Sequence, residues 1–236
     1  MEKKILLVGD SLSKGVVLDE EKKRYTLLKD SFFSLLSNTI NAQLINASKF
    51  GSTVLQGQKQ LESKMEKYDP DIVVIEFGGN DCDFHWDDIA SDPMKEHIPN
   101  TPLELFESSM SGMVDYVQSS GKTVVLTTLP PIYAESYFKW FTKCDGEKGR
   151  TILKWLKDVW RIYRWQEMYS NCVGNIARAK NIACIDIRQA FLKSREFVNL
   201  ICSDGIHPNE DGHRLIYETV MSFIRVNASY LLPARI

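Results

Sequence analysis

Short apolar runs alternate along the chain with longer segments in which apolar residues recur every three or four positions. The runs occupy residues 4–8, 43–47, 71–77, 122–127 and 182–186. Continuous runs rich in Val, Ile and Leu are typical of strands buried on both faces of a parallel sheet. The segments between them predict helices, most clearly over 25–40, 103–118 and 209–226. Strands and helices that alternate in this way build an α/β fold.

This alternation predicts a three-layer α/β/α sandwich in one domain over residues 1–236. Its five parallel strands are expected in the flavodoxin-like order second, first, third, fourth, fifth, with the switch point between the first and third strands. The loops after the first three strands then open at one edge of the sheet. Ligands of such sheets bind at that edge.

The stretch 131–165 does not fit the sandwich and is expected to be an aromatic-rich helical insert after the fourth strand. It holds four of the five tryptophans, and the spacing over 152–163 predicts an amphipathic helix. The preferred interpretation is an aromatic stripe packed on the body. A cap that walls the substrate pocket stays open, with Trp140, Trp155 and Trp160 as pocket candidates. A homo-oligomer interface and single-stranded nucleic-acid binding are further alternatives, and acidic residues within the insert weaken the last.

Composition places the chain among ordinary globular proteins. It has 236 residues, of which 44% are hydrophobic and 25% charged, so one large core is expected. With 29 basic and 31 acidic residues the net charge is −2. This balance gives no electrostatic argument for a nucleic acid or an anionic membrane as partner. No apolar run approaches the roughly 18 residues of a membrane span.

The cysteines and the first residues bear on the compartment. Five cysteines, an odd number, are widely spaced without a Cys-x-x-Cys pair, which favours reduced thiols. The first strand begins within the first few residues, so no signal peptide is expected. A cytoplasmic protein is the preferred interpretation, and a secreted one whose signal peptide has been removed stays open.

Candidate chemistry begins at Ser11, which follows the first apolar run directly. A serine at the carboxyl end of a strand is a candidate nucleophile or phosphate-binding hydroxyl, although alone it is more often a helix N-cap. Gly51, Asn80, Asp204 and His207 also lie in loops at the ends of expected elements. Each alone fits a turn or a surface position. Together, in order and at one sheet edge, they favour a hydrolase site.

Four blocks in order resemble the GDSL, or SGNH, hydrolase family. They are Gly9-Asp10-Ser11-Leu12, Gly51 after the second strand, Gly78-Gly79-Asn80-Asp81, and Asp204-Gly205-Ile206-His207-Pro208. The resemblance implies a Ser-His-Asp triad in which Ser11 is the nucleophile, His207 the general base and Asp204 the residue that orients it. It also implies an oxyanion hole made of the Ser11 and Gly51 backbone N–H groups and the Asn80 amide. No metal or organic cofactor is implied.

The chemistry of these positions agrees with the resemblance. Glycine at 51 would let a backbone donor approach a substrate without a Cβ in the way. Asn80 is a neutral donor, whereas a carboxylate there would repel an oxyanion. Asp10 is expected to bond backbone N–H groups of nearby loops at the edge of the substrate pocket.

The resemblance implies a carboxylic ester hydrolase acting on a small-molecule ester. Family members include carbohydrate acetyl esterases, lysophospholipases, thioesterases and arylesterases. The aromatic insert suits sugar rings as well as acyl chains. Small or short acyl esters are the preferred substrates, with carbohydrate O-acetyl esters ahead of lipids. A lysophospholipase or thioesterase of the same family stays open, as does a catalytically silent flavodoxin-like binding module.

Three further features have simpler interpretations. Acidic residues over 81–92, with His85 and His97, match no metal-binding loop, so a solvated loop at the cleft wall is preferred. The turn 9–15 is not a phosphate-binding loop, because Lys14 precedes glycine instead of following it. His213 is expected on the surface of the last helix.

Overall fold

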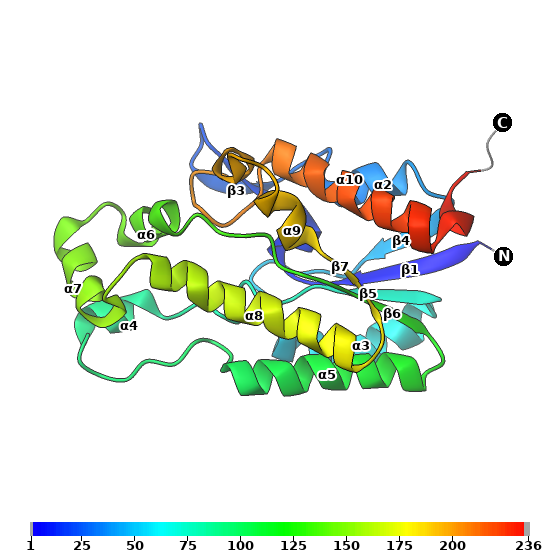
Figure 1. Cartoon of the computed structure of the whole chain (residues 1–236), viewed down its shortest axis with the longest axis horizontal. Helices are drawn as coiled ribbons and strands as arrows, with labels where there is room; N and C mark the ends of the chain where they lie inside the picture. The colour runs from blue at the N-terminus through cyan, green and yellow to red at the C-terminus, as the bar shows by residue number, and fades with distance from the viewer. Residues whose placement is uncertain (1, 234–236) are drawn as a thin grey trace.

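Five parallel strands form the central sheet of the computed structural model, which describes residues 2–233 (Figure 1). They are β1 (Lys3–Val8), β4 (Ala42–Asn46), β5 (Ile72–Ile75), β6 (Thr123–Thr127) and β7 (Ala183–Ile185). Their order in the sheet is β4-β1-β5-β6-β7, which confirms the predicted order. In this register Leu6 of β1 pairs with Ile45 on one side and with Val73 on the other.

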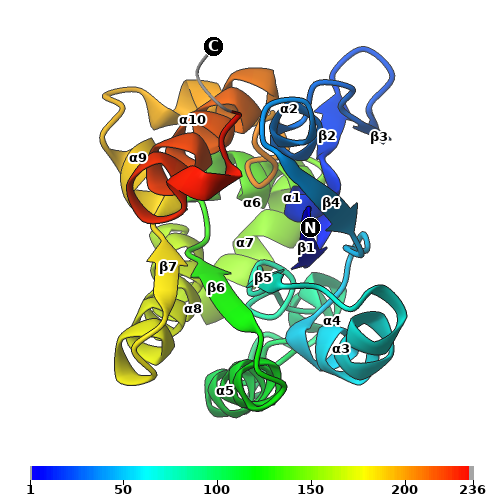
Figure 2. The same ribbon diagram turned by 90° about the vertical axis from the view of Figure 1, so that its right-hand side faces the viewer.

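Successive side chains of each strand point to opposite faces of the sheet. Leu6 and Val8 join one apolar cluster, whereas Ile5 and Leu7 join another. The first face is covered by α3 (Val54–Tyr68), α5 (Leu103–Ser119) and α8 (Trp160–Ala179). The second is covered by α2 (Phe32–Ser37), α9 (Ile187–Leu192) and α10 (Glu210–Asn227). Figure 2 shows the predicted three layers, with the sheet between the two sets of helices.

The helices predicted over 103–118 and 209–226 are confirmed within one residue at each end, as α5 and α10. Pro102 takes the N-cap position of α5, just before the first turn. Asn209 caps α10, because its Oδ1 accepts from the Gly212 N–H at 3.0 Å. Such a cap stabilises a helix by about 1 kcal/mol. The short helices η1 (Phe197–Leu200) and η2 (Ser229–Leu231) lie on either side of α10 in the sequence.

The predicted helix over 25–40 is wrong in its first half. Residues Val16–Asp19 and Arg24–Leu27 form an antiparallel hairpin, β2 and β3, in which Leu18 pairs with Tyr25. In the hairpin, hydrogen bonds between the two strands pair the backbone N–H and C=O groups that the predicted helix would have paired within itself. The helix α2 begins only at Phe32, after Ser31 has capped it by accepting from the Ser34 N–H.

The aromatic insert after β6 contains α6 (Ala134–Thr142), α7 (Gly146–Leu156) and the first turns of α8. The helix expected across 152–163 is interrupted, because α7 ends at Leu156 and Lys157 has a φ of 66°. A residue in this left-handed region commonly ends a helix. The insert and α4 (Trp86–Ser91) share an apolar cluster of their own, in which the rings of Trp86 and Phe141 stack at 4.2 Å.

His213 is fully buried in α10, so its expected surface position is wrong. It lies on the same side of the helix as Ile216 and Ile224, which pack on the sheet. Its ring stacks on Phe32 of α2, with centroids 5.8 Å apart. Burial lowers the pKa of His213 to about 4, because the charged imidazolium would lose its water.

We predict that His213→Phe removes an acid-sensitive part of the protein's stability. Between pH 6.5 and 4 the unfolded chain binds a proton at His213 that the folded chain does not bind, so stability falls as the pH falls. The full loss is about 3 kcal/mol. The measurement is the free energy of unfolding in urea, for wild type and variant, at pH 7.5 and 4.5. At pH 4.5 the free energy of unfolding of the variant should be higher, relative to that of wild type, than it is at pH 7.5.

The matched control is His85→Phe, at an exposed histidine, which should follow wild type at both pH values. A difference between His213→Phe and wild type that does not change with pH would contradict the prediction.

Candidate active site

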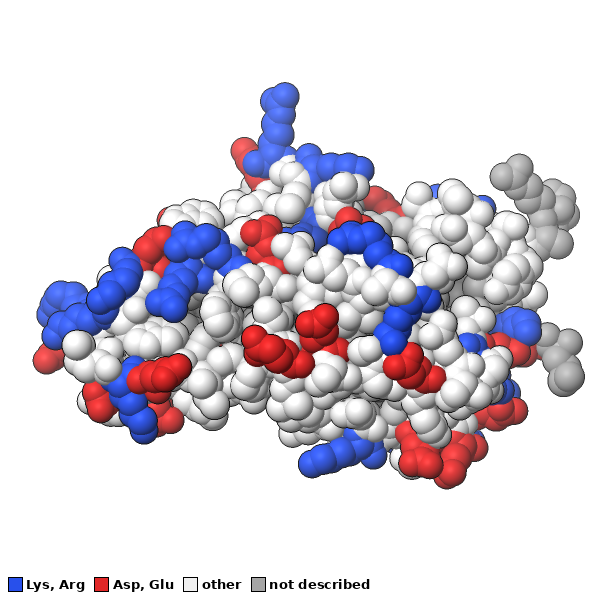
Figure 3. All heavy atoms as spheres, turned by 60° about the horizontal axis from the view of Figure 1, so that its bottom comes forward, with Lys and Arg blue, Asp and Glu red and all other residues white. Residues whose placement is uncertain are grey.

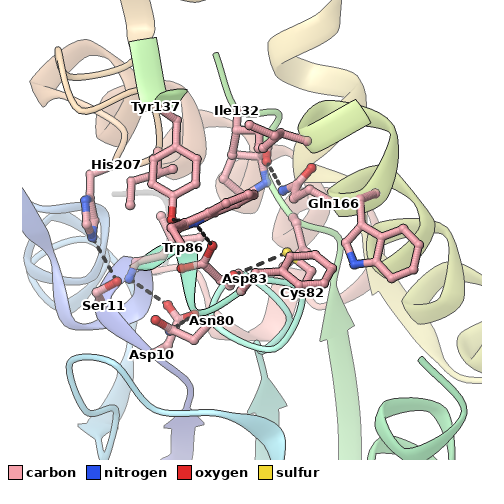
Figure 4. A pocket seen from close by; sticks show the side chains of 18 of the residues that line it. Asp10, Ser11, Asn80, Cys82, Asp83, Trp86, Ile132, Tyr137, Gln166 and His207 are labelled. Carbon is pink, nitrogen blue, oxygen red and sulfur yellow. Dashed lines mark hydrogen bonds between the residues drawn. The ribbon is translucent and has the colours of Figure 1, made fainter. Parts of the chain in front are cut away.

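The predicted site residues lie at the carboxyl edge of the sheet. Ser11 opens the short helix α1 (Ser11–Lys14) directly after β1, and Asn80 lies in the loop after β5. Asp204 and His207 lie in the loop before α10. Together with Phe50, from the loop after β4, residues of these loops line one pocket (Figure 4).

Ser11, His207 and Asp204 form a continuous chain of hydrogen bonds. The Nδ1 atom of His207 lies 2.6 Å from Oδ2 of Asp204, and its Nε2 atom lies 3.0 Å from Oγ of Ser11. Because a carboxylate can only accept, Nδ1 carries the proton and Nε2 is free to accept from the serine hydroxyl. Asp204 is fully buried, and its Oδ1 accepts from the backbone N–H groups of Ile206 and His207. The arrangement can move a proton from the serine to the imidazole.

Two aromatic rings that the sequence did not indicate hold the imidazole of His207. Tyr25 of β3 lies 4.9 Å from it, and Phe50 stacks nearly parallel to it at 6.3 Å, centroid to centroid. Tyr25 was assigned to a helix because the hairpin was missed. The signal that could have revealed the hairpin is the apolar run at 16–18, separated from Tyr25 by a charged stretch over 19–24.

The predicted oxyanion donors differ in the hydrogen bonds that they make within the protein. The Nδ2 group of Asn80 donates to Oδ2 of Asp10 at 3.0 Å and to the carbonyl of Ser52 at 3.1 Å, so both of its hydrogens are engaged. A substrate oxyanion would share one of them. Gly51 has a φ of 70°, a region that favours glycine, although a Cβ there would meet no protein atom within 4 Å. Within residues 2–233 its N–H bonds no backbone acceptor.

Three buried carboxyl groups support these loops. Oδ1 of Asp10 accepts from the Leu12 N–H at 2.9 Å, and Oε2 of Glu76 accepts from the Ser13 hydroxyl at 2.9 Å and the Asp10 N–H at 3.3 Å. Asp81 accepts from the Val54 N–H at the start of α3. Burial raises the pKa of Asp10, with the charge of Glu76 adding to the effect, and burial raises that of Asp81 to about 6.

The pocket beyond Ser11 holds about 170 Å³. Apolar and aromatic side chains from the loop after β5 and from α4, α7 and α8 dominate its inner part: Phe84, Trp86, Trp155, Leu156, Ile162 and Trp165. The insert therefore both packs on α4 and walls this pocket. Of the three tryptophans named as pocket candidates, Trp155 lines the pocket. Trp140 lines a neighbouring groove instead.

Trp160 does not line either cavity, which corrects its assignment as a pocket residue. Its side chain is 43% exposed at the start of α8 and contacts Tyr163, with ring centroids 6.1 Å apart.

Several polar groups in the pocket are bonded to the protein, whereas Nε1 of Trp165 is buried without a hydrogen-bond partner among residues 2–233. An Asp83 carboxylate oxygen accepts from Nε1 of Trp86 at 2.9 Å, and burial raises the pKa of Asp83. Gln166 donates to the carbonyl of Pro130 at 2.8 Å and accepts from Arg188 at 2.7 Å. The guanidinium of Arg188 is buried, so the amide of Gln166 has a fixed orientation.

The acidic stretch expected to form a solvated loop divides into two parts. Asp81 is buried and Asp83 is partly buried, whereas Asp87 and Asp88 are exposed, and Asp87 pairs with Lys148 at 2.6 Å. Across residues 2–233, no three His, Cys, Asp or Glu side chains are grouped so as to hold a metal ion. In the same range, no helix combines the length and the apolar character needed to cross a bilayer.

A family model for the GDSL-like Lipase/Acylhydrolase family matches residues 7–215. The chain belongs to this family. The matched range includes Ser11, Asn80, Asp204 and His207. An arylesterase of Vibrio mimicus is 31% identical over 140 residues, which are 58% of this chain and 61% of that protein. The esterase TesA of Pseudomonas aeruginosa is 27% identical over 144 residues, which are 60% and 63% of the two chains. The chain thus matches less than two thirds of the length of these relatives.

Solved structures share the fold of this GDSL-family chain. A lipase/acylhydrolase from Enterococcus faecalis superposes with a TM-score of 0.70 at 21% identity, covering 99% of this chain and 100% of that one. A mutant of an acetylxylan esterase from Geobacillus stearothermophilus superposes with a TM-score of 0.66 at 20% identity, covering 100% of this chain and 99% of that one. At these sequence identities the structural similarity establishes the α/β/α fold and does not identify the substrate.

We predict that Asp10 contributes to ester hydrolysis by orienting the side-chain amide of Asn80. Removal of one oxyanion donor costs about 2.7 to 4 kcal/mol in the transition state. Asn80→Ala should therefore lower kcat by about two orders of magnitude. Asp10→Ala removes one acceptor of that amide and also the acceptor of the Leu12 N–H at the start of α1. It should lower kcat about tenfold with KM nearly unchanged. The measurement is steady-state hydrolysis of p-nitrophenyl acetate.

The double variant Asp10→Ala/Asn80→Ala separates this role from a general one. If Asp10 acts through Asn80, the double variant should be about as slow as Asn80→Ala alone. Losses that multiply would show that Asp10 acts by another route, and thermal melting of each variant controls for unfolding.

Proposed function

We propose that the chain hydrolyses carboxylic esters of small or short acyl groups, with O-acetyl esters of carbohydrates as the preferred class. The observation that carries the proposal is the bonded chain Ser11–His207–Asp204 at the mouth of an apolar pocket of about 170 Å³. A nucleophile, a base and an orienting carboxylate in hydrogen-bond contact are the parts that acyl transfer requires.

In the first half of the proposed reaction, Oγ of Ser11 attacks the ester carbonyl carbon while Nε2 of His207 takes the serine proton. Asp204 stabilises the imidazolium that forms. The Ser11 and Gly51 backbone N–H groups and the Asn80 amide stabilise the negative charge on the carbonyl oxygen. The tetrahedral intermediate then collapses, the bond to the alcohol oxygen breaks, and His207 returns its proton to the leaving alcohol.

In the second half, water attacks the acyl-serine and His207 takes the water's proton. Collapse of the second intermediate releases the carboxylic acid and returns the proton to Ser11. Every proton leaves and returns through Nε2. For this reason the 2.6 Å contact between Nδ1 and Asp204 matters in both halves.

The size and lining of the pocket support a short acyl group. Trp86, Trp155 and Trp165 close its inner part, and aromatic walls leave little room for a long flexible chain. The fold is shared with an acetylxylan esterase, which agrees with an acetyl ester as substrate. Relatives named as an esterase and as a thioesterase and lysophospholipase keep a longer acyl group as the second candidate. The apolar character of the pocket favours that candidate.

We predict that Ser11→Ala abolishes hydrolysis of p-nitrophenyl acetate, butyrate and octanoate, with a loss of kcat of about six orders of magnitude. Asp204→Asn should lower kcat by about four orders, because the imidazole then adopts the wrong tautomer. Wild type should be fastest on acetate. Retained turnover in Ser11→Ala would remove this residue as nucleophile, and an inactive wild type would favour the binding-module interpretation.

Acyl preference should depend on Trp155. Trp155→Ala enlarges the pocket, so we predict that the ratio of kcat/KM on octanoate to that on acetate rises about tenfold. This is the effect of burying about two further methylenes at about 0.8 kcal/mol each. Trp160→Ala removes a tryptophan of the same insert that lines neither cavity and should leave the ratio unchanged. An unchanged ratio in Trp155→Ala would mean that the acyl group lies elsewhere.

A further inference from the structure

A second cavity of about 730 Å³ lies beside the pocket of Ser11. The two cavities share Tyr25, Tyr137 and Ile206 as lining residues. Beyond this shared wall, the groove runs along α6 and its C-terminal turn, where Trp140 and Lys143 line it. The groove is therefore the neighbour of the catalytic pocket, and Tyr25, Tyr137 and Ile206 stand between the two cavities.

The groove lies on the side of the site where the alcohol leaves. In the proposed reaction Nε2 of His207 must reach both Oγ of Ser11 and the departing oxygen. The imidazole contacts Tyr25 at 4.9 Å, and Tyr25 in turn contacts Trp140 at 6.2 Å, centroid to centroid. An alcohol that receives its proton from His207 thus extends over Tyr25 into the groove, while the acyl group occupies the pocket walled by Trp155.

The lining of the groove is positively charged. It includes Lys23, Lys139 and Lys143 and no aspartate or glutamate. Glu20 neutralises Lys23 at 3.0 Å. Within residues 2–233 no acidic group lies within ion-pair distance of Lys139 or Lys143. Figure 3, which brings the opposite side of the molecule forward, shows basic and acidic side chains side by side at the end that carries α7.

The turn after α6 keeps a lysine where glycine is usual. Lys143 and Cys144 have φ values of 55° and 58°, a region that is strained for residues with a Cβ. The side chain of Lys143 lines the groove beside Trp140, whose ring is partly exposed. Together these residues offer a flat apolar surface with two ammonium groups at its rim.

We propose that this groove is the leaving-group subsite and that it takes an alcohol that carries a negative charge, such as a carboxylate or a phosphate. The carbon skeleton of the alcohol packs on Tyr25 and Trp140, and its anionic group lies between Lys139 and Lys143. The proposal rests on the proposed ester hydrolysis and specifies which esters are preferred. An acidic sugar and a phosphorylated alcohol have this chemistry in common.

The test compares two acetyl esters that differ by one carboxylate, phenyl acetate and 4-acetoxybenzoate. Relative to wild type, Lys139→Gln/Lys143→Gln should lose about tenfold in kcat/KM on 4-acetoxybenzoate and less than about twofold on phenyl acetate, as two exposed charge pairs would give. In wild type the effect should shrink as salt rises from 20 to 500 mM. The control Lys59→Gln/Lys154→Gln removes the same charge at exposed sites outside both cavities.

The outcomes separate the subsite from the underlying activity. Equal losses on both esters, or equal effects of the two double variants, would overturn the subsite while ester hydrolysis stands. Failure of wild type to hydrolyse phenyl acetate would instead overturn the proposed function. Acetylated polygalacturonate and 1-acetylglycerol 3-phosphate are then each compared with neutral acetylated xylan. These comparisons show whether the preferred alcohol is an acidic sugar or a phosphorylated alcohol. Preference for neither anionic substrate over the xylan would also count against the subsite.

Discussion

Two buried carboxyl groups hold the carboxyl ends of β1 and β5 together, and the geometry of the site depends on this contact. Glu76, just after β5, accepts from the Ser13 hydroxyl and the Asp10 N–H, both just after β1. Asp10 accepts from the Leu12 N–H and from the amide of Asn80. One bonded unit thus fixes the start of α1, which carries Ser11, relative to the loop that carries Asn80.

These hydrogen bonds fix the geometry of the site, but burying the carboxyl groups lowers the free energy of unfolding of the protein. Burial raises the pKa of both Asp10 and Glu76, so ionising both costs free energy that their N–H and O–H donors only partly offset. Asp81, whose pKa of about 6 has the same cause, adds to the penalty at neutral pH. The apolar clusters on the two faces of the sheet compensate, because they bury apolar side chains along the whole length of the strands.

Sequence patterns predicted what local chemistry determines and failed where distant contacts decide. The five strands followed from five continuous apolar runs, and their order from the flavodoxin-like topology of such α/β folds. The helices α5 and α10 followed from spacing and caps. The hairpin of β2 and β3 was missed because its pairing competes with helical spacing that continues into α2. The burial of His213 depends on Phe32, far away in the sequence. Four motif blocks indicated the candidate triad, whereas Tyr25 and Phe50 carry no motif and reach His207 only through the fold.

The insert after β6 is the part of the chain in which substrate choice can change without disturbing the chemistry. Its helix α7 supplies Trp155 to the proposed acyl pocket. Its helix α6 supplies Lys139 and Trp140, and the turn after α6 supplies Lys143, to the proposed alcohol subsite. These contacts involve neither Asp10 nor Glu76. The insert also packs in its own apolar cluster with α4, so its side chains can vary while the sheet edge keeps its bonds. His207, between Tyr25 and the reacting serine, is the point at which the two cavities meet.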